Sequence, residues 1–183
     1  YISGAILFDE TIKQSTSQGM SFPDYLAKIG IIPGIKVDAG AKPFSCHPNE
    51  KITEGLDDLP KRMEEYKSLG AKFAKWRAVI TIGDSIPSNA CMIANSHALA
   101  RYASICQEVD IVPIVEPEVL MDGTHDIQKC FDVTNATQSI LFETLDKLNV
   151  DLSGIILKPN MISSGTSCEK KSSSEEIAEL TIK

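Results

Sequence analysis

The sequence predicts an α/β protein built from parallel β-α-β units, and two observations indicate this class. Short runs rich in isoleucine, valine and alanine recur along the chain, and segments with helical periodicity separate most of them. Alternation of strands and helices is typical of a parallel sheet. The runs are close to continuously apolar, as expected for strands covered by helices. The five predicted strands are Ile2–Phe8, Ile31–Val37, Lys72–Ala78, Ile111–Pro117 and Gly154–Lys158.

Residues typical of helix ends delimit four helices between or after these strands. Asp58 is a suitable N-cap for a helix that begins near Leu59 and ends at Gly70, where glycine accommodates the left-handed conformation. Pro87 begins a second helix that extends to about Gln107. The remaining helices are predicted over Asp126–Leu148 and from the capping box Ser173–Glu176.

Two architectures fit this alternation, a doubly wound open sheet and a (β/α)8 barrel. A nucleotide-binding open sheet has a glycine-rich turn after its first strand, but Phe8–Thr11 follows here, which favours the barrel. A full barrel has eight units and typically ~250 residues, so five units in 183 residues form only part of one. We therefore expect residues 1–183 to form a single, incomplete (β/α)8 TIM-barrel domain.

Composition narrows the classes of partner. The net charge of −7 and the pI of about 5.0 disfavour nucleic acid binding, since no broad basic face is available. The longest apolar runs, such as Ile111–Val115, are far shorter than the ~20 residues of a membrane span. Five cysteines without a Cys-x-x-Cys pair predict reduced thiols in a cytoplasmic protein. The three histidines lack metal-ligand spacing, so we expect no metal and no cofactor.

Charged side chains at the C-terminal ends of four predicted strands are the candidate functional residues. Lysine and glutamate are rarely buried without a partner. One such residue marks a strand end that emerges into solvent, but in a parallel barrel four such ends converge on the mouth where active sites lie. The residues are Lys36, Lys75, Arg77, Glu116, Glu118 and Lys158.

This combination of residue types predicts a reaction class. A lysine kept partly neutral by burial and by neighbouring cations is a nucleophile toward carbonyl groups and forms a Schiff base. A nearby carboxylate transfers the protons that dehydration of the carbinolamine requires. The remaining cations suit phosphate groups. The interpretation is metal-free, imine-based carbon–carbon chemistry on a phosphorylated sugar.

Five segments then resemble one family, class I fructose-1,6-bisphosphate aldolase, in order and with the expected gaps over essentially the whole chain. The family fold is a (β/α)8 barrel, and the chain resembles its second strand through the start of its sixth helix. Each segment alone is weak, but five in register are highly specific. They are Gly34–Asp38, Phe73–Arg77, Ala100–Gln107, Pro113–Glu118 and Leu157–Met161.

The resemblance also implies residue roles. Lys158 matches the Schiff-base lysine that attacks the C2 carbonyl of the ketose, and Glu116 matches the acid/base glutamate. Lys75 matches the lysine that helps charge balance and proton transfer between them, with Glu118 as a supporting carboxylate. The residues that match substrate-phosphate ligands are Lys36 and Arg77.

The chain departs from the family pattern in three respects. The catalytic aspartate of the family's first strand lies before Tyr1. The serine and arginine that bind the other phosphate lie beyond Lys183. Asp110 replaces a glycine that is common before the glutamate strand, at a small cost at the helix C-terminus.

The resemblance implies reversible cleavage of fructose 1,6-bisphosphate, a sugar bisphosphate, to dihydroxyacetone phosphate and glyceraldehyde 3-phosphate in glycolysis and gluconeogenesis. It also implies a cytoplasmic homotetramer and, because the family binds actin, cytoskeletal binding. The alternatives are a non-catalytic aldolase-fold scaffold and another imine-forming enzyme such as a transaldolase. Retention of the charged cluster argues against the first, and Lys75–Arg77 argues against the second.

Overall fold

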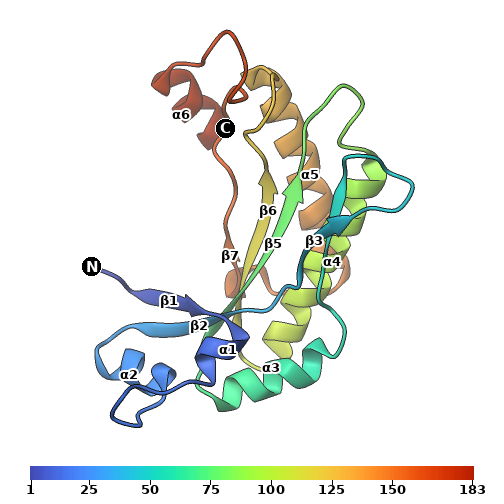
Figure 1. Ribbon diagram of the computed structural model, residues 1–183. Coiled ribbons are helices and arrows are strands. Elements are labelled where there is room, and N and C mark those ends of the chain that lie inside the picture. The colour runs from blue at the N-terminus through green and yellow to red at the C-terminus, as the bar shows by residue number, and fades with distance from the viewer.

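A five-stranded parallel sheet forms the centre of the computed structural model, which describes all 183 residues (Figure 1). Its strands follow the order β1-β2-β5-β6-β7, so the five main strands are neighbours in sequence order, as predicted. β1 and β7 are the edge strands, each with one neighbour. The bounds are β1 Gly4–Leu7, β2 Ile32–Lys36, β5 Phe73–Ile80, β6 Val112–Val119 and β7 Ile156–Leu157.

Helices lie mainly on one face of this sheet, and α3, α4 and α5 supply its longest covering elements (Figure 1). The sheet twists strongly, so that β1 and β2 run across the direction of β5 and β6 in this view. The helices are α1 Asp9–Ile12, α2 Phe22–Lys28, α3 Leu59–Ser68, α4 Asn89–Glu108, α5 Ile127–Lys147 and α6 Ser174–Ile182, with a 3₁₀ turn at Leu152–Gly154.

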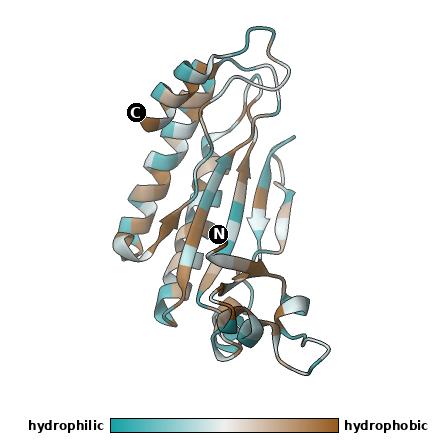
Figure 2. Ribbon diagram, turned by 90° about the vertical axis from the view of Figure 1, so that its left-hand side faces the viewer, coloured by the Kyte–Doolittle hydropathy of each residue, from teal (hydrophilic) through white to brown (hydrophobic).

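The central strand β5 alternates strictly between buried and partly exposed residues, which corrects the prediction of continuously buried strands. Ala74, Trp76 and Ala78 are fully buried and face the helices. Trp76 stacks on Tyr102 of α4 with ring centroids 5.5 Å apart. The opposite face of the sheet is therefore free to carry polar side chains, and Figure 2 shows hydrophilic segments interrupting the hydrophobic central strands.

The helix ends confirm some predicted caps and correct others. Gly70 has φ +101°, and the capping box at Ser173 is formed in full. The prediction that Pro87 begins α4 is wrong, because Ser88 is the N-cap and its hydroxyl accepts a hydrogen bond from the Cys91 N–H at 3.1 Å. Asp58 precedes α3 as predicted, but its side chain makes no cap hydrogen bond.

A β-hairpin, formed by β3 (Gly40–Pro43) and β4 (Lys51–Glu54), was not predicted. Its strands are short and rich in lysine, proline and glutamate, so they lack the apolar run that marks the main strands. The hairpin packs beside β5 and is anchored by Asn95 of α4, whose side chain donates to the Lys51 carbonyl at 2.9 Å. No helix of the structure is long and apolar enough to span a membrane.

Candidate active site

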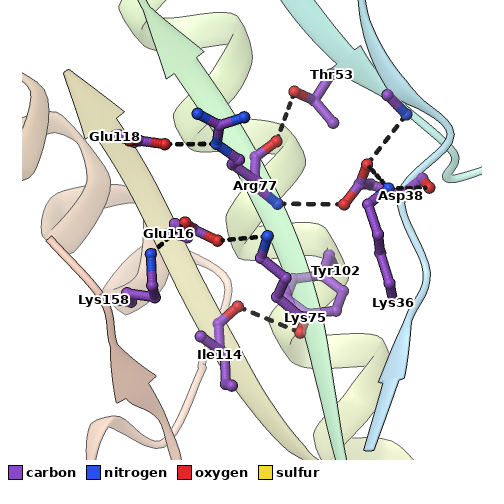
Figure 3. Close-up of polar contacts among 11 residues, drawn as sticks. Lys36, Asp38, Thr53, Lys75, Arg77, Tyr102, Ile114, Glu116, Glu118 and Lys158 are labelled. Carbon is purple, nitrogen blue, oxygen red and sulfur yellow. Dashed lines mark hydrogen bonds and ion pairs between the residues drawn. The ribbon is translucent and has the colours of Figure 1, made fainter. Parts of the chain in front are cut away.

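The predicted charged residues meet on the face of the sheet that the covering helices leave free (Figure 3). Lys75 and Arg77 belong to β5, while Glu116 and Glu118 belong to the adjacent β6. These four side chains rise from within the strands and not from their ends, because β5 and β6 extend beyond their predicted limits to Ile80 and Val119. The remaining two predicted residues, Lys36 and Lys158, stand at the last position of β2 and directly after β7.

Glu116 is the centre of the cluster, and only 2% of it is exposed. Its Oε1 accepts a hydrogen bond from Lys158 Nζ at 2.5 Å. Its Oε2 lies 3.1 Å from Lys75 Nζ, close enough for an ion pair, but this oxygen accepts no hydrogen bond. One carboxylate therefore serves two amines, and one of its oxygens remains able to exchange a proton with a bound molecule.

Arg77 and Glu118 form a second pair beside this centre through the Arg77 Nε–H. The hydrogen bond from Arg77 to this carboxylate raises the pKa of the guanidinium above its usual range. The backbone of Arg77 is held from both sides: its N–H donates to Asp38 Oδ2 at 3.3 Å, and its carbonyl accepts from Thr53 Oγ1 at 2.8 Å. The guanidinium therefore extends from a fixed backbone with terminal N–H groups free for an anion.

Lys36 is the Cα partner of Lys75 in the parallel register, so both side chains start from neighbouring positions on one face. The Lys36 ammonium turns away from Lys75 and donates to Asp38 Oδ1 at 2.6 Å. It also lies 6.0 Å from the centroid of the Phe8 ring. Six predicted residues thus form three groups: Lys36 apart from the rest, Arg77 with Glu118, and two lysines with Glu116.

Three residues that support the cluster were not assigned from the sequence: Asp38, Thr53 and Asn95. Asn95 accepts a hydrogen bond from the Thr53 N–H at 3.1 Å and so positions the hydroxyl that holds Arg77. Asp38 could have been found from the sequence, because it follows Lys36 by two residues and so lies on the same face of an extended chain. Thr53 and Asn95 could not, because their partners depend on the unpredicted hairpin.

The arrangement suits covalent amine chemistry on an anionic substrate. Lys158 is the exposed amine, with 57% of its side chain accessible, whereas Lys75 is 19% accessible. Four cations face three carboxylates here, so the surface retains positive charge for phosphate groups. No group of three or more histidine, cysteine, aspartate or glutamate side chains could hold a metal ion.

A parallel sheet with helices on one face and a lysine–glutamate–lysine cluster on the other defines an α/β-barrel type of protein with a site suited to amine chemistry. A family model described as fructose-bisphosphate aldolase class-I (glycolytic) matches residues 1–183. The chain therefore belongs to the class I fructose-bisphosphate aldolase family.

Individual relatives agree with this membership. The probable fructose-bisphosphate aldolase class 1 of Xanthomonas axonopodis pv. citri is 61% identical over 182 residues, which are 100% of this chain and 54% of the relative. Fructose-bisphosphate aldolase 1 of Toxoplasma gondii is 48% identical over 185 residues, 100% of this chain and 51% of the relative. The chain spans about half the length of the curated relatives it matches.

A solved structure shows the same fold. It is fructose-bisphosphate aldolase from Plasmodium falciparum in a ternary complex with TRAP and a small-molecule inhibitor. The match has a TM-score of 0.95 and 45% identity, and covers 99% of this chain and 53% of that chain. The predicted fold class, a parallel (β/α)8 barrel of which this chain forms part, is confirmed.

Proposed function

We propose that the full-length protein is a Schiff-base aldolase that reversibly cleaves fructose 1,6-bisphosphate to dihydroxyacetone phosphate and glyceraldehyde 3-phosphate. The observation that carries this proposal is the 2.5 Å hydrogen bond from Lys158 Nζ to buried Glu116. It pairs an exposed amine with a carboxylate that can move protons at the carbon the amine attacks. Family membership and 61% identity to an aldolase support it.

The residues have distinct roles in this proposal. The neutral amine of Lys158 attacks the C2 carbonyl, and the carbinolamine hydroxyl leaves as water after it takes a proton from Glu116. The resulting iminium accepts the electron pair when the C3–C4 bond breaks, while the C4 hydroxyl loses its proton to a base and becomes the aldehyde. Lys75 balances the charge of Glu116 as protons pass, and Glu118 supports the site by holding Arg77.

Lys36 and Arg77 bind a substrate phosphate in this scheme. Arg77 offers terminal N–H groups in a planar fork, and Lys36 offers a compact point charge. A non-catalytic scaffold is the less favoured alternative, because burying Glu116 between two lysines costs free energy and a scaffold has no reason to retain that cost.

We also propose that residues 1–183 belong to a single (β/α)8 barrel domain, whose further strands would pair with the open edges of β1 and β7. The five free cysteines fit a reducing compartment, so we propose a cytoplasmic enzyme of glycolysis and gluconeogenesis. A homotetramer and cytoskeletal binding, both implied by the family resemblance, belong to the same proposal.

The decisive experiment is reductive trapping. Borohydride added to the full-length protein with dihydroxyacetone phosphate should leave a covalent adduct on Lys158, located by peptide mass spectrometry. Lys158→Arg keeps the charge but forms no imine, so it should abolish adduct and turnover without unfolding the protein. The control Lys147→Arg, at an exposed lysine of α5, should retain both. An adduct on Lys36 or Lys75, or full activity of Lys158→Arg, would contradict the assignment.

A further inference from the structure

Asp38 is a buried carboxylate in the candidate site to which the proposed chemistry gives no role. Only 3% of its side chain is exposed. Its Oδ1 accepts hydrogen bonds from Lys36 Nζ at 2.6 Å and from the Gly40 N–H at 3.0 Å. Its Oδ2 accepts from the Arg77 N–H at 3.3 Å. Both oxygens are therefore engaged, and the carboxylate is held in one orientation (Figure 3).

The hairpin covers Asp38 closely. A Cβ atom on Gly55, which has φ +127°, would lie 3.1 Å from Asp38 Cα and 2.7 Å from the Ala39 N atom. Only glycine therefore allows the chain after β4 to approach so near. Two backbone N–H donors and the close approach of Gly55 therefore hold the Asp38 carboxylate independently of Lys36.

Lys36, in contrast, has a flexible four-carbon stem and three N–H donors. Two of these donors are used by Asp38, one by its Oδ1 and one by its carbonyl oxygen at 3.1 Å. The third donor makes no hydrogen bond, 26% of the Lys36 side chain is exposed, and Lys36 helps to line a hollow of about 390 Å³. Asp38 thus fixes the ammonium with one donor free.

We propose that Asp38 is a positioning residue that holds the Lys36 ammonium where it can bind a phosphate group of the substrate. The inference rests on the proposed role of Lys36 as a phosphate ligand. Without Asp38, the ammonium would move among many rotamers beside Lys75 and Arg77, whose like charges repel it. Ordering it would then cost free energy each time a phosphate binds.

The test is a double-mutant cycle read by binding and not by turnover. The probe is hexitol 1,6-bisphosphate, which carries two phosphates but has no carbonyl and cannot form an imine. Asp38→Asn should raise the Kd measured by calorimetry about tenfold. The amide would turn an NH2 group toward one of the donors from which Asp38 now accepts a hydrogen bond. Lys36→Met should raise it by at least as much. In the Lys36→Met background, Asp38→Asn should add less than about twofold.

Two controls distinguish loss of the Lys36 contact from a general change of charge or of fold. Asp57→Asn removes a charge from the exposed rim of the same hollow and should leave the Kd within about twofold. Asp38→Asn should still form the trapped adduct on Lys158 at saturating dihydroxyacetone phosphate, which shows an intact fold. Failure to trap any adduct in the wild-type protein would overturn the proposed aldolase chemistry but not the role of Asp38, because the double-mutant cycle measures phosphate binding without imine formation.

Three outcomes would overturn the inference. Multiplicative effects of the two substitutions would show that Asp38 acts independently of Lys36. Tighter binding by Asp38→Asn would show that the carboxylate competes with phosphate for the ammonium. If Asp38→Asn does not fold, acetic anhydride labelling of the wild-type protein decides. Lys36, with 26% of its side chain exposed, should react no faster than Lys75, which is 19% exposed and makes no hydrogen bond, and faster reaction of Lys36 contradicts the inference.

Discussion

Replacing Glu116 with glutamine tests the centre of the site with little change of shape. The amide oxygen of Glu116→Gln can still accept the hydrogen bond that Lys158 Nζ now gives at 2.5 Å. The amide nitrogen then faces Lys75 Nζ, which lies 3.1 Å from Oε2 in the native site. The substitution therefore removes the negative charge and the exchangeable proton, and places two donors opposite each other.

Loss of proton transfer sets the size of the result. A positioned general acid contributes about 10² to 10⁴ in rate, or about 3–5 kcal/mol in the barrier. Imine formation should therefore slow by at least ~100-fold in Glu116→Gln.

The assay is the time course of borohydride-trapped adduct after mixing the full-length protein with dihydroxyacetone phosphate. The matched control is Glu118→Gln, two residues along the same face of β6, whose carboxylate contacts Arg77 and not Lys158. It should change the rate of imine formation less than about threefold. Adduct formation at the wild-type rate in Glu116→Gln, or an equal slowing in Glu118→Gln, would refute the assignment of Glu116 as the proton donor.

Three further predictions concern other parts of the molecule. Burial lowers the pKa of the His125 imidazole. The stabilising contribution of neutral His125 is therefore complete above the unfolded pKa of about 6.5 and is lost as pH falls through the lower folded pKa. His125→Met should flatten the dependence of Tm on pH between 7.5 and 5.5, and an unchanged slope would contradict this. Iodoacetamide should alkylate exposed Cys46 in the folded protein but not buried Cys91 or Cys106. Burial raises the pKa of the Cys91 thiol to about 11 and also raises that of Cys106. Peptide mass spectrometry identifies the alkylated cysteines, and labelling of Cys106 in the folded protein would contradict the prediction. Asn95→Leu leaves the Thr53 N–H without its partner and leaves the Lys51 carbonyl with only the Cys91 thiol at 3.5 Å. It should lower the free energy of unfolding by about 2–4 kcal/mol in urea titrations, whereas a loss below about 1 kcal/mol would show that water replaces these bonds.

The main sheet was predictable because its strands are marked by local composition. Each run is apolar enough to identify a buried strand, and helical periodicity between runs dictates parallel pairing with neighbours in sequence order. The hairpin β3–β4 was not predictable by the same reasoning. Its stability comes from tertiary contacts with α4, such as the bond from Asn95 to a residue 44 positions away, and not from apolar strands of its own.

In the candidate site, too, residues placed by strand patterns were predictable and residues placed by tertiary contacts were not. Lys75 and Arg77 share one face because strand side chains alternate, and parallel pairing brings Glu116 beside them. The supports of Arg77 could not be found in this way, because Asp38 and Thr53 lie 39 and 24 residues from it. Those contacts form only when the end of β2 lies beside β5 and the β3–β4 hairpin packs against β5.

The uneven pairing of charges supports the proposal that Lys158, and not another lysine, is the reacting amine. Lys36 has its own carboxylate in Asp38, which occupies two of its three donors. Lys75 and Lys158 share Glu116, so neither has a counter-charge to itself. Of these two, Lys75 lies low on the sheet with 19% of its side chain exposed, whereas Lys158 follows β7 and is 57% exposed. In the proposed reaction Lys158 attacks the carbonyl, and Lys75 acts only through the carboxylate that both lysines share.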